Sequence, residues 1–406
     1  MDAVERIARS AAGLIDEGLL GELGVDGIAD RLGVTSRHLR RVFGREFGVT
    51  PIAFAQTQRL LLAKQLIADT SLSLTDIAFA SGFQSVRRFD ALFQQRYRLS
   101  PSNMRRTSRG SEIPDALQFE LSYRPPYDWD GIVSFLAARS IAGVEEVSHG
   151  TYRRILRIQQ AGKSHTGWLE VSPQPQRQTL RVLVSASLAK VIPVVLARVK
   201  HLFDLSCNPA DVGEVLGALA TKRPGLRVPG ACDGFEVAVR AVLGQQISVS
   251  AARTLAGRMA AAFGTAVSSP FAELQFAFPR ANEIAKLDAN DVARLGMTGA
   301  RARTIVELAK AIQQGNLRLA PGLDAVEITK NLRAIPGIGE WTAQYVAMRA
   351  LAWPDAFPHS DLALMKALGE NNPKKVLARG EAWRPWRAYA VMHLWSNASA
   401  TARREK

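Results

Sequence analysis

The chain has 406 residues, of which 47% are hydrophobic, and it carries a formal net charge of +15. This length predicts two to four domains, because single hydrophobic cores stop growing near roughly 250–300 residues. The hydrophobic content excludes a largely disordered chain, and no apolar run reaches the roughly 20 residues that cross a membrane. The positive charge favours a polyanionic partner such as nucleic acid, with a merely basic protein as the alternative.

Cysteine and histidine usage limits the metal and redox chemistry. Cys207 and Cys232 are too few for a disulfide scaffold, a four-thiolate zinc site or an iron–sulfur cluster. The six histidines show no spacing typical of metal ligands, and the first residues do not resemble a signal peptide. We therefore expect reduced thiols, no metal site and an intracellular protein.

The first quarter of the chain has the apolar spacing of helices and contains two helix-turn-helix patterns, at residues 27–43 and 74–89. Gly33 and Gly82 lie where each tight turn needs a residue tolerant of positive φ, and Ser36 is expected to cap the helix after the first turn. Such helices present polar side chains to base edges and phosphates, and a solvated helix face is the alternative. The candidate DNA contacts are Arg37, Arg40, Gln84, Ser85, Arg87 and Arg88.

A long helix, predicted from Pro51 to Ala68, joins these two patterns. The second pattern continues from Ile77 (IAFASGF) to the RLSP sequence that ends at Pro101. Together they resemble the DNA-binding module of AraC-type transcription regulators. The resemblance implies a double helix-turn-helix domain over residues 1–107, with promoter DNA as a partner.

After the helix-turn-helix patterns, the spacing of polar and apolar residues changes. Residues 105–111 are polar and basic without a pattern, which predicts a linker. Apolar residues then alternate, for example at 155–158 and 179–184, which predicts a small sheet. A helix is expected from about Leu188 to Phe203, and from Leu226 onward the chain returns to helices.

The sharpest motif is the hairpin Pro336-Gly337-Ile338-Gly339 between two predicted helices. Its glycines let backbones approach closely, and the N–H groups at the start of the second helix form an anion site. We therefore expect Gly337, Ile338 and Gly339 to bind a DNA phosphate, with a simple turn as the alternative. Asp361 opens a later helix, where the helix dipole stabilises a carboxylate, and an ordinary N-cap is its alternative.

The segment from about Leu117 to Ala398, which contains the hairpin and Asp361, resembles DNA-3-methyladenine glycosylases of the AlkA type, in the helix-hairpin-helix superfamily. The matching stretches are RPPYDW at 124–129, LFDLSCNP at 202–209, LGQQIS at 243–248 and WRPWRAYA at 383–390. The resemblance implies a multidomain, mainly helical protein with one small α+β domain. That domain, like half a TATA-binding protein, is expected over 112–225, and the helix-hairpin-helix glycosylase domain over 226–400.

The same resemblance implies roles for individual residues. Asp361 would stabilise the cationic sugar and orient the water, and Trp341, Tyr345 and Trp395 would line an aromatic base pocket. Gln246 stands where the family inserts a wedge as the damaged base flips out, although the AlkA type carries leucine there. For each aromatic the alternative is core packing, which we assign to Trp383 and Trp386.

The implied activity is a monofunctional glycosylase that removes alkylated bases such as 3-methyladenine and 7-methylguanine from duplex DNA. Lyase-type relatives place a nucleophilic lysine two residues after the last hairpin glycine, where this chain has Trp341. A cationic alkylated purine is already a good leaving group, so no dedicated general acid is required. We expect no cofactor beyond a monovalent cation at the hairpin–phosphate contact, a monomer, and action at the nucleoid in the bacterial cytoplasm.

Two other functions stay open at this stage. The glycosylase fold could serve a transcriptional regulator as a sensor of alkylation damage without turnover, or it could bind bent DNA in general. Retention of Asp361, the hairpin and the aromatics favours the enzyme. In adaptive-response regulators an AraC-type module follows a cysteine-rich methyl-accepting zinc domain; this chain lacks its cysteines, so we expect that domain to have been lost or truncated.

Overall fold

The computed structural model describes residues 3–16, 18–69, 72–105, 116–160 and 162–404. Residues 106–111 of the predicted linker, and the expected domain boundary at residue 112, lie outside the described residues. The chain divides into two compact units. One comprises Met1–Leu121, Leu156–Ser172 and Leu180–Val199, and the other Ser122–Ile155, Pro173–Thr179 and Lys200–Lys406.

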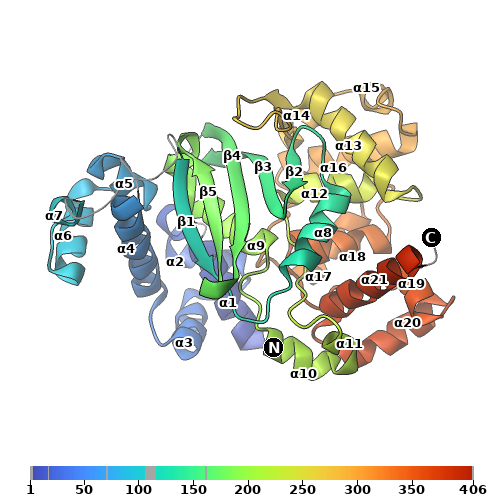
Figure 1. Cartoon of the computed structure of the whole chain (residues 1–406), viewed down its shortest axis with the longest axis horizontal. Helices are drawn as coiled ribbons and strands as arrows, with labels where there is room; N and C mark the ends of the chain where they lie inside the picture. The colour runs from blue at the N-terminus through green and yellow to red at the C-terminus, as the bar shows by residue number, and fades with distance from the viewer. Residues whose placement is uncertain (1–2, 17, 70–71, 106–115, 161, 405–406) are drawn as a thin grey trace. The chain divides into compact units, whose positions relative to one another are not determined.

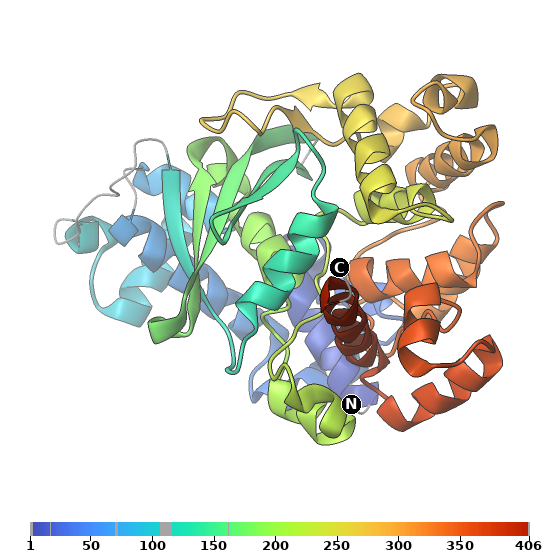
Figure 2. The ribbon, with the colours of Figure 1, turned by 45° about the vertical axis from the view of Figure 1, so that its right-hand side comes forward.

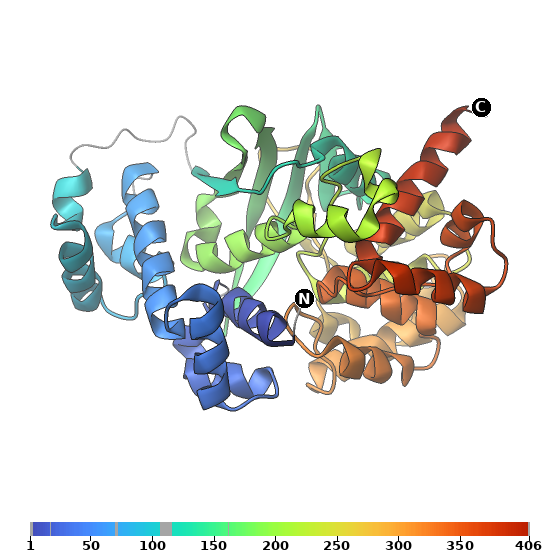
Figure 3. The same ribbon diagram turned by 90° about the horizontal axis from the view of Figure 1, so that it is seen from below.

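The N-terminal module is built around one long helix, α4. Helices α1, α2 and α3 contact it, and so do α5 and α7, so that α4 joins two helical groups (Figures 1 and 3). The predicted long helix between the two helix-turn-helix patterns is therefore present. The helices are α1 (Ala3–Asp16), α2 (Leu20–Arg31), α3 (Ser36–Phe47), α4 (Pro51–Asp69), α5 (Leu74–Ala80), α6 (Val86–Tyr97) and α7 (Pro101–Arg105).

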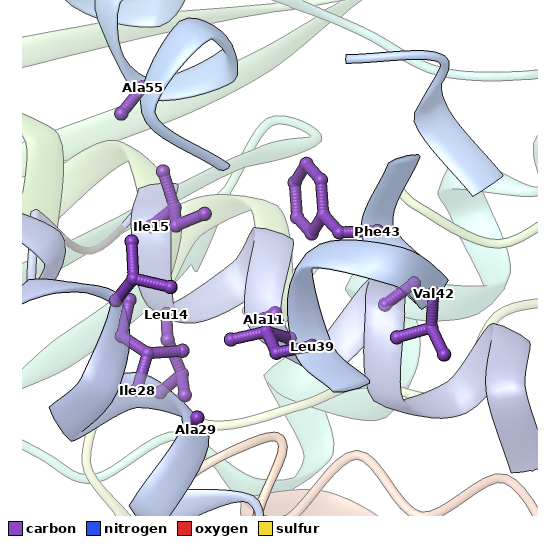
Figure 4. Packing of buried hydrophobic residues seen from close by; sticks show 11 residues of the cluster. Ala11, Leu14, Ile15, Ile28, Ala29, Leu39, Val42, Phe43 and Ala55 are labelled. Carbon is purple, nitrogen blue, oxygen red and sulfur yellow. The ribbon is translucent and has the colours of Figure 1, made fainter. Parts of the chain in front are cut away.

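Apolar side chains from the first four helices close one core in this module (Figure 4). Leu14 of α1 and Leu39 and Phe43 of α3 are almost completely buried there. Leu39 and Phe43 are four residues apart, so they lie on the same face of α3. The opposite face of that helix is thereby left to solvent.

Both helix-turn-helix turns use glycine in a conformation that other residues rarely adopt. Gly33 has φ of 66° and Gly82 has φ of 85°. The expectation that Ser36 caps the helix after the first turn is wrong. Thr35 is the cap, because its extended backbone lets its Oγ1 accept the N–H of His38 at 3.2 Å. Ser85 caps α6 in the same way, accepting the N–H of Arg88.

The predicted small sheet is present and has five strands in the order β1-β5-β4-β3-β2 (Figure 1). Strands β2 and β3 pair antiparallel, with Glu145 opposite Arg154. The helix expected from Leu188 begins instead as a 3-10 turn and becomes α-helical at Ile192, where Pro193 is tolerated in the first turn. The elements are β1 (Ala116–Ser122), α8 (Trp129–Arg139), β2 (Glu145–Ser148), β3 (Thr151–Gln160), β4 (Lys163–Gln174), η1 (Pro175–Arg177), β5 (Thr179–Ser185), η2 (Ala186–Val191) and α9 (Ile192–Leu202).

The remainder is mostly helical, as predicted, with one unpredicted two-stranded ribbon formed by β6 and β7. Helix α12 packs on α18, and α19 packs on α21 (Figure 2). No described helix is long and apolar enough to span a membrane. The elements are α10 (Pro209–Leu216), α11 (Ala218–Thr221), α12 (Gly234–Leu243), α13 (Val249–Phe263), β6 (Thr265–Ala266), β7 (Phe276–Ala277), α14 (Ala281–Ile284), α15 (Ala289–Ala293), α16 (Gly299–Gln313), α17 (Ala325–Arg333), α18 (Glu340–Ala350), α19 (Leu362–Leu368), α20 (Pro373–Gly380), η3 (Glu381–Trp383) and α21 (Arg387–Arg404).

Candidate functional site

The predicted hairpin joins α17 to α18. Gly337 has φ of 89°, and a Cβ built there would lie 2.1 Å from Oγ1 of Thr304, so no other residue fits. Gly339 precedes α18 and supplies no side-chain cap. The first N–H groups of an α-helix have no partner within the helix. The start of α18 therefore keeps backbone donors for an external anion.

The glutamine pair after α12 divides into an anchored and an exposed residue. The Gln245 amide donates to the carbonyl oxygen of Gly337 at 2.9 Å and to Oγ1 of Thr342 at 3.0 Å. Gln246 is exposed and has φ of 55°. Sequence reasoning singled out Gln246 and missed Gln245, because two adjacent glutamines give no signal of which one braces the hairpin.

Asp361 is the N-cap of α19, as its position predicted, and it is half-buried. Its Oδ1 accepts the backbone N–H of Leu364 at 2.8 Å. Two indole N–H groups also bind this carboxylate: Nε1 of Trp341 donates to Oδ2 at 2.8 Å, and Nε1 of Trp395 donates to Oδ1 at 2.9 Å. The carboxylate is thus held by donors from α18, α19 and α21. An ordinary N-cap would need only the hydrogen bond from the backbone N–H of Leu364.

The three aromatics expected in a pocket lie together beside Asp361. The rings of Trp341 and Tyr345 are nearly parallel, with centroids 5.4 Å apart, and Tyr345 lies 6.3 Å from Trp395. Phe135 of α8 faces Trp395 at 6.4 Å with an interplanar angle of 14°. Sequence reasoning missed Phe135, because nothing distinguishes it from the other apolar residues of its helix.

Two arginines that the sequence did not single out flank these rings. Arg349 is only 2% exposed and donates to the carbonyl oxygens of Pro229 and Gly230, each at 2.8 Å. Its Nη1 donates to the hydroxyl of Tyr345 at 3.0 Å. The guanidinium of Arg139 lies 3.8 Å from the ring centroid of Phe135. Positive charge is therefore concentrated behind the aromatic side chains.

This charge acts on Tyr345. Burial alone raises the pKa of a tyrosine, because it disfavours the charged form. Here Arg349, Arg139 and Arg240 outweigh burial and lower the pKa of Tyr345 to about 8. A tyrosine with that pKa is partly ionised near neutral pH.

A buried ion network supports α12 beside the site. Arg154 pairs with Glu236 at 2.6 Å, and Arg240 pairs with Glu145 at 2.7 Å and Glu236 at 3.2 Å. Tyr152 also donates its hydroxyl to Glu145. Burial raises the pKa of Glu145, but Arg240 and Arg154 outweigh it and hold that pKa below its ordinary value. The network joins β2, β3 and α12.

In the N-terminal module, the expected DNA contacts remain accessible. Arg37 and Arg40 on α3, and Arg87 on α6, are exposed. Arg88, Gln84 and Ser85 are exposed as well, but the side chains of Gln84 and Ser85 already form hydrogen bonds within the protein. The Gln84 amide donates to the carbonyl oxygen of Gly21, and Ser85 is the cap of α6.

The remaining expectations concern cysteines, metals and two tryptophans. Cys207 and Cys232 are buried and form no disulfide. Within the described ranges, no group of three or more histidine, cysteine, aspartate and glutamate side chains is placed to hold a metal ion. Trp386 is buried and packs edge-on against Tyr389, and Trp383 is half-buried against Phe357.

Three family models match the chain in sequence order. A helix-turn-helix domain matches residues 28–107, and the AlkA N-terminal domain matches residues 118–233. The model of the HhH-GPD superfamily of base excision DNA repair proteins matches residues 239–385, which include the hairpin and Asp361.

Named relatives and a solved structure are similar to most or to two thirds of this chain. The chain is 37% identical over 97% of its length to the "Probable bifunctional transcriptional activator/DNA repair enzyme AlkA" of Mycobacterium tuberculosis, covering 80% of that protein. It is 38% identical to DNA-3-methyladenine glycosylase 2 of Escherichia coli, over 68% of this chain and 96% of that one. In fold, 69% of the chain matches 98% of a 3-methyladenine DNA glycosylase from Archaeoglobus fulgidus, with a TM-score of 0.58 and 21% identity.

Proposed function

The chain belongs to the AlkA-type family of DNA-3-methyladenine glycosylases that carry an AraC-type helix-turn-helix module, and from this premise we propose its substrate and its catalytic residues. The substrate is duplex DNA containing alkylated purines such as 3-methyladenine and 7-methylguanine. The enzyme hydrolyses the N-glycosidic bond and leaves an abasic site. The observation that carries this proposal is the Asp361 carboxylate, which receives indole N–H groups from both Trp341 and Trp395 at 2.8 and 2.9 Å.

In the proposed mechanism, Asp361 faces the sugar as positive charge develops at C1′. The hydrogen bonds from Trp341 and Trp395 hold the carboxylate in place, so little reorganisation is needed when the bond breaks. The carboxylate also orients the attacking water. The electron-rich rings around it bind the cationic purine by stacking and cation–π attraction.

The proposed DNA contacts follow from the same geometry. The damaged nucleotide flips out of the duplex, and Gln246 fills the space that it leaves. The backbone N–H groups of the hairpin bind a phosphate, and a monovalent cation held by the hairpin would supply further positive charge at that contact. We propose further that the protein acts as a monomer on chromosomal DNA in the cytoplasm.

For the N-terminal module, we propose sequence-specific binding to promoter DNA. Arg37, Arg40 and Arg87 are exposed on the helices that follow the two glycine turns. In helix-turn-helix proteins this is the helix that enters the major groove, where arginine reads guanine.

The test is release of 3-methyladenine and 7-methylguanine from alkylated DNA by the full chain and by Asp361→Asn. We expect the substitution to lower the release rate at least about 100-fold, as loss of a transition-state charge partner does. Asp288→Asn is the matched control, because Asp288 is also a helix N-cap, on α15. A truncated chain starting near Ser111 should stay active.

The opposite outcome has a definite meaning. If the intact protein releases no base yet binds damaged or promoter DNA tightly and specifically, the enzyme proposal fails. The chain would then be a transcriptional regulator that senses alkylation damage without turnover.

A further inference from the structure

The loop that carries Gln246 is held by hydrogen bonds on both sides of that residue. This glutamine loop, residues 244–248, joins α12 to α13. Before Gln246, the backbone carbonyl oxygen of Gln245 accepts a hydrogen bond from Nη2 of Arg301 on α16. After it, the side-chain oxygen of Ser248 caps α13. The backbone of the loop is therefore fixed on either side of its exposed residue.

Helix α16 fixes the hairpin as well as the glutamine loop. Thr304 follows Arg301 by three residues, so the two side chains lie on the same face of the helix. Oγ1 of Thr304 donates to the carbonyl oxygen of Pro336 at 2.9 Å. The amide of Gln245 joins the loop directly to the hairpin, because it donates to the carbonyl oxygen of Gly337. Contacts among α16, the glutamine loop and the hairpin therefore connect each of the three to the other two.

The backbone of Gln246 is in a conformation that needs such support. Its φ is 55°, in the left-handed region that residues other than glycine rarely adopt. A residue in this region persists there only where its surroundings enforce the conformation. Gln246 is exposed, so the enforcing contacts must come from its neighbours in the loop.

The hydrogen bond from Arg301 acts directly on this dihedral angle. The carbonyl oxygen of Gln245 belongs to the peptide group that joins Gln245 to Gln246. Because the peptide group is planar, its rotation changes ψ of Gln245 and φ of Gln246 together. By holding that oxygen, Arg301 resists the rotation that would release Gln246 from its left-handed conformation.

We propose that Arg301 is a positioning residue for base flipping, which keeps Gln246 in the orientation that fills the duplex when the damaged nucleotide leaves. This inference rests on the proposed function, in which Gln246 takes that place. A side chain that is already oriented makes flipping less costly, because less has to be ordered as it enters the base stack. Arg301 therefore acts on the flipping step, whereas Asp361 acts on the bond that breaks afterwards.

This role makes the importance of Arg301 depend on how the damaged base is paired. Flipping out a paired base costs both pairing and stacking, and an unpaired base costs less. A residue that acts on bond breaking would matter equally for both kinds of base. Loss of Arg301 should instead slow release mainly from paired sites.

The test is single-turnover release of 7-methylguanine by the full chain and by Arg301→Met. One duplex places the damaged base opposite cytosine, and the other places it opposite a tetrahydrofuran abasic analogue, which leaves it unpaired. Release from the paired site should fall about 10-fold, the factor that follows when a strained backbone conformation is no longer enforced. Release from the unpaired site should fall less than about 3-fold, because flipping costs less there.

Two other substitutions at this position sharpen the comparison. Arg301→Lys keeps an N–H donor, and one carbonyl oxygen needs only one, so it should restore most of the release from the paired site. Arg301→Gln has a shorter polar side chain and should repeat the result of Arg301→Met, which provides a second reading if the methionine variant does not fold.

A double substitution asks whether Arg301 acts through Gln246. Gln246→Ala removes the side chain that is positioned. Adding Arg301→Met to it should lower release from the paired site by less than about 2-fold further, because residues that act as one unit are not additive. A 2-aminopurine placed beside the damaged base fluoresces more when stacking is lost, and Arg301→Met should reduce this signal on its own.

Arg253→Met is the matched control. Nε of Arg253 donates to the carbonyl oxygen of Ser140 at 3.1 Å, so the substitution removes the same kind of hydrogen bond at another place. Release from both duplexes should stay at the wild-type rate.

Three results would overturn the proposal. Equal losses on both duplexes would show a general structural role, and no loss on either would show that the hydrogen bond is dispensable. Fully additive losses with Gln246→Ala would show that Arg301 contacts the DNA itself. If the wild type releases no 7-methylguanine from either duplex, the proposed function fails instead, and the 2-aminopurine signal still tests the positioning of Gln246.

Discussion

The two DNA-facing regions of this chain use polar residues in opposite ways. In the N-terminal module, Arg37, Arg40 and Arg87 stand exposed on helix surfaces. In the glycosylase region, the Asp361 carboxylate is held by three N–H donors, and Arg349 is buried with three fixed partners. Surface arginines that recognise DNA need only be correctly placed on the helix, because the DNA supplies the complementary groups. Stabilising a transition state requires preorganisation, because the charge partner must already be in place.

This difference predicts unequal sensitivity to substitution, and the largest effect is expected in the buried ion network. Glu236→Gln would leave Arg154 and Arg240 with Glu145 as their only remaining carboxylate partner among the described residues. All four side chains are largely buried, so solvent does not replace the lost charge. Removing one partner of a buried ion pair costs about 3–5 kcal/mol. The free energy of unfolding, measured with urea, should fall by that amount.

Glu307→Gln is the control for this loss of stability. Glu307 pairs with Lys310 on the surface of α16, where an ion pair contributes about 0–1 kcal/mol. Equal losses for Glu236→Gln and Glu307→Gln would contradict the network's structural role.

The next effect concerns the rate of base release rather than stability. Trp341→Phe removes the indole N–H that donates to Asp361 at 2.8 Å but keeps an aromatic ring. We expect single-turnover release of 3-methyladenine to fall about 100-fold, the size of effect seen when one preorganised donor is removed. Trp383→Phe, outside the aromatic cluster, should retain the wild-type rate. Near-normal release by Trp341→Phe would show that this hydrogen bond is not needed to organise the Asp361 carboxylate for base release.

The sequence predicted those parts of the fold that depend on local signals. The glycines of both helix-turn-helix turns, the Pro-Gly-Ile-Gly hairpin and the N-cap position of Asp361 are local features, and the structure contains all of them. The Ser36 prediction was wrong by one residue, because serine and threonine are both good caps and adjacent here.

The sequence could not predict the contacts made across long separations. Phe135 and Trp395 are 260 positions apart, and Arg349 meets the carbonyl of Pro229 through tertiary packing. Gln245 and Gln246 are chemically identical, and only the path of the loop decides which one braces the hairpin. The family resemblance predicted Trp341, Tyr345 and Trp395 as pocket residues. The arginines around Tyr345 could be identified only from the structure, because they come from three different helices.

The smallest effect is expected at the exposed arginines. Arg87→Ala removes one solvated side chain from the start of α6, so the fold and base release should stay unchanged. Binding to a cognate promoter duplex should weaken by about 1–3 kcal/mol if the side chain reads a base, with discrimination lost at one position. If Arg87 instead contacts a phosphate, Arg87→Ala should weaken binding to all sequences. The slope of the logarithm of the binding constant against the logarithm of the salt concentration should then fall in magnitude by about one, because about one fewer counterion is released.

Arg96→Ala, in the last turn of the same helix, is the control, because that end lies away from the groove in helix-turn-helix complexes. If Arg87→Ala lowered base release as much as Trp341→Phe does, the two regions would not act separately, and the contrast between exposed recognition and preorganised catalysis would fail.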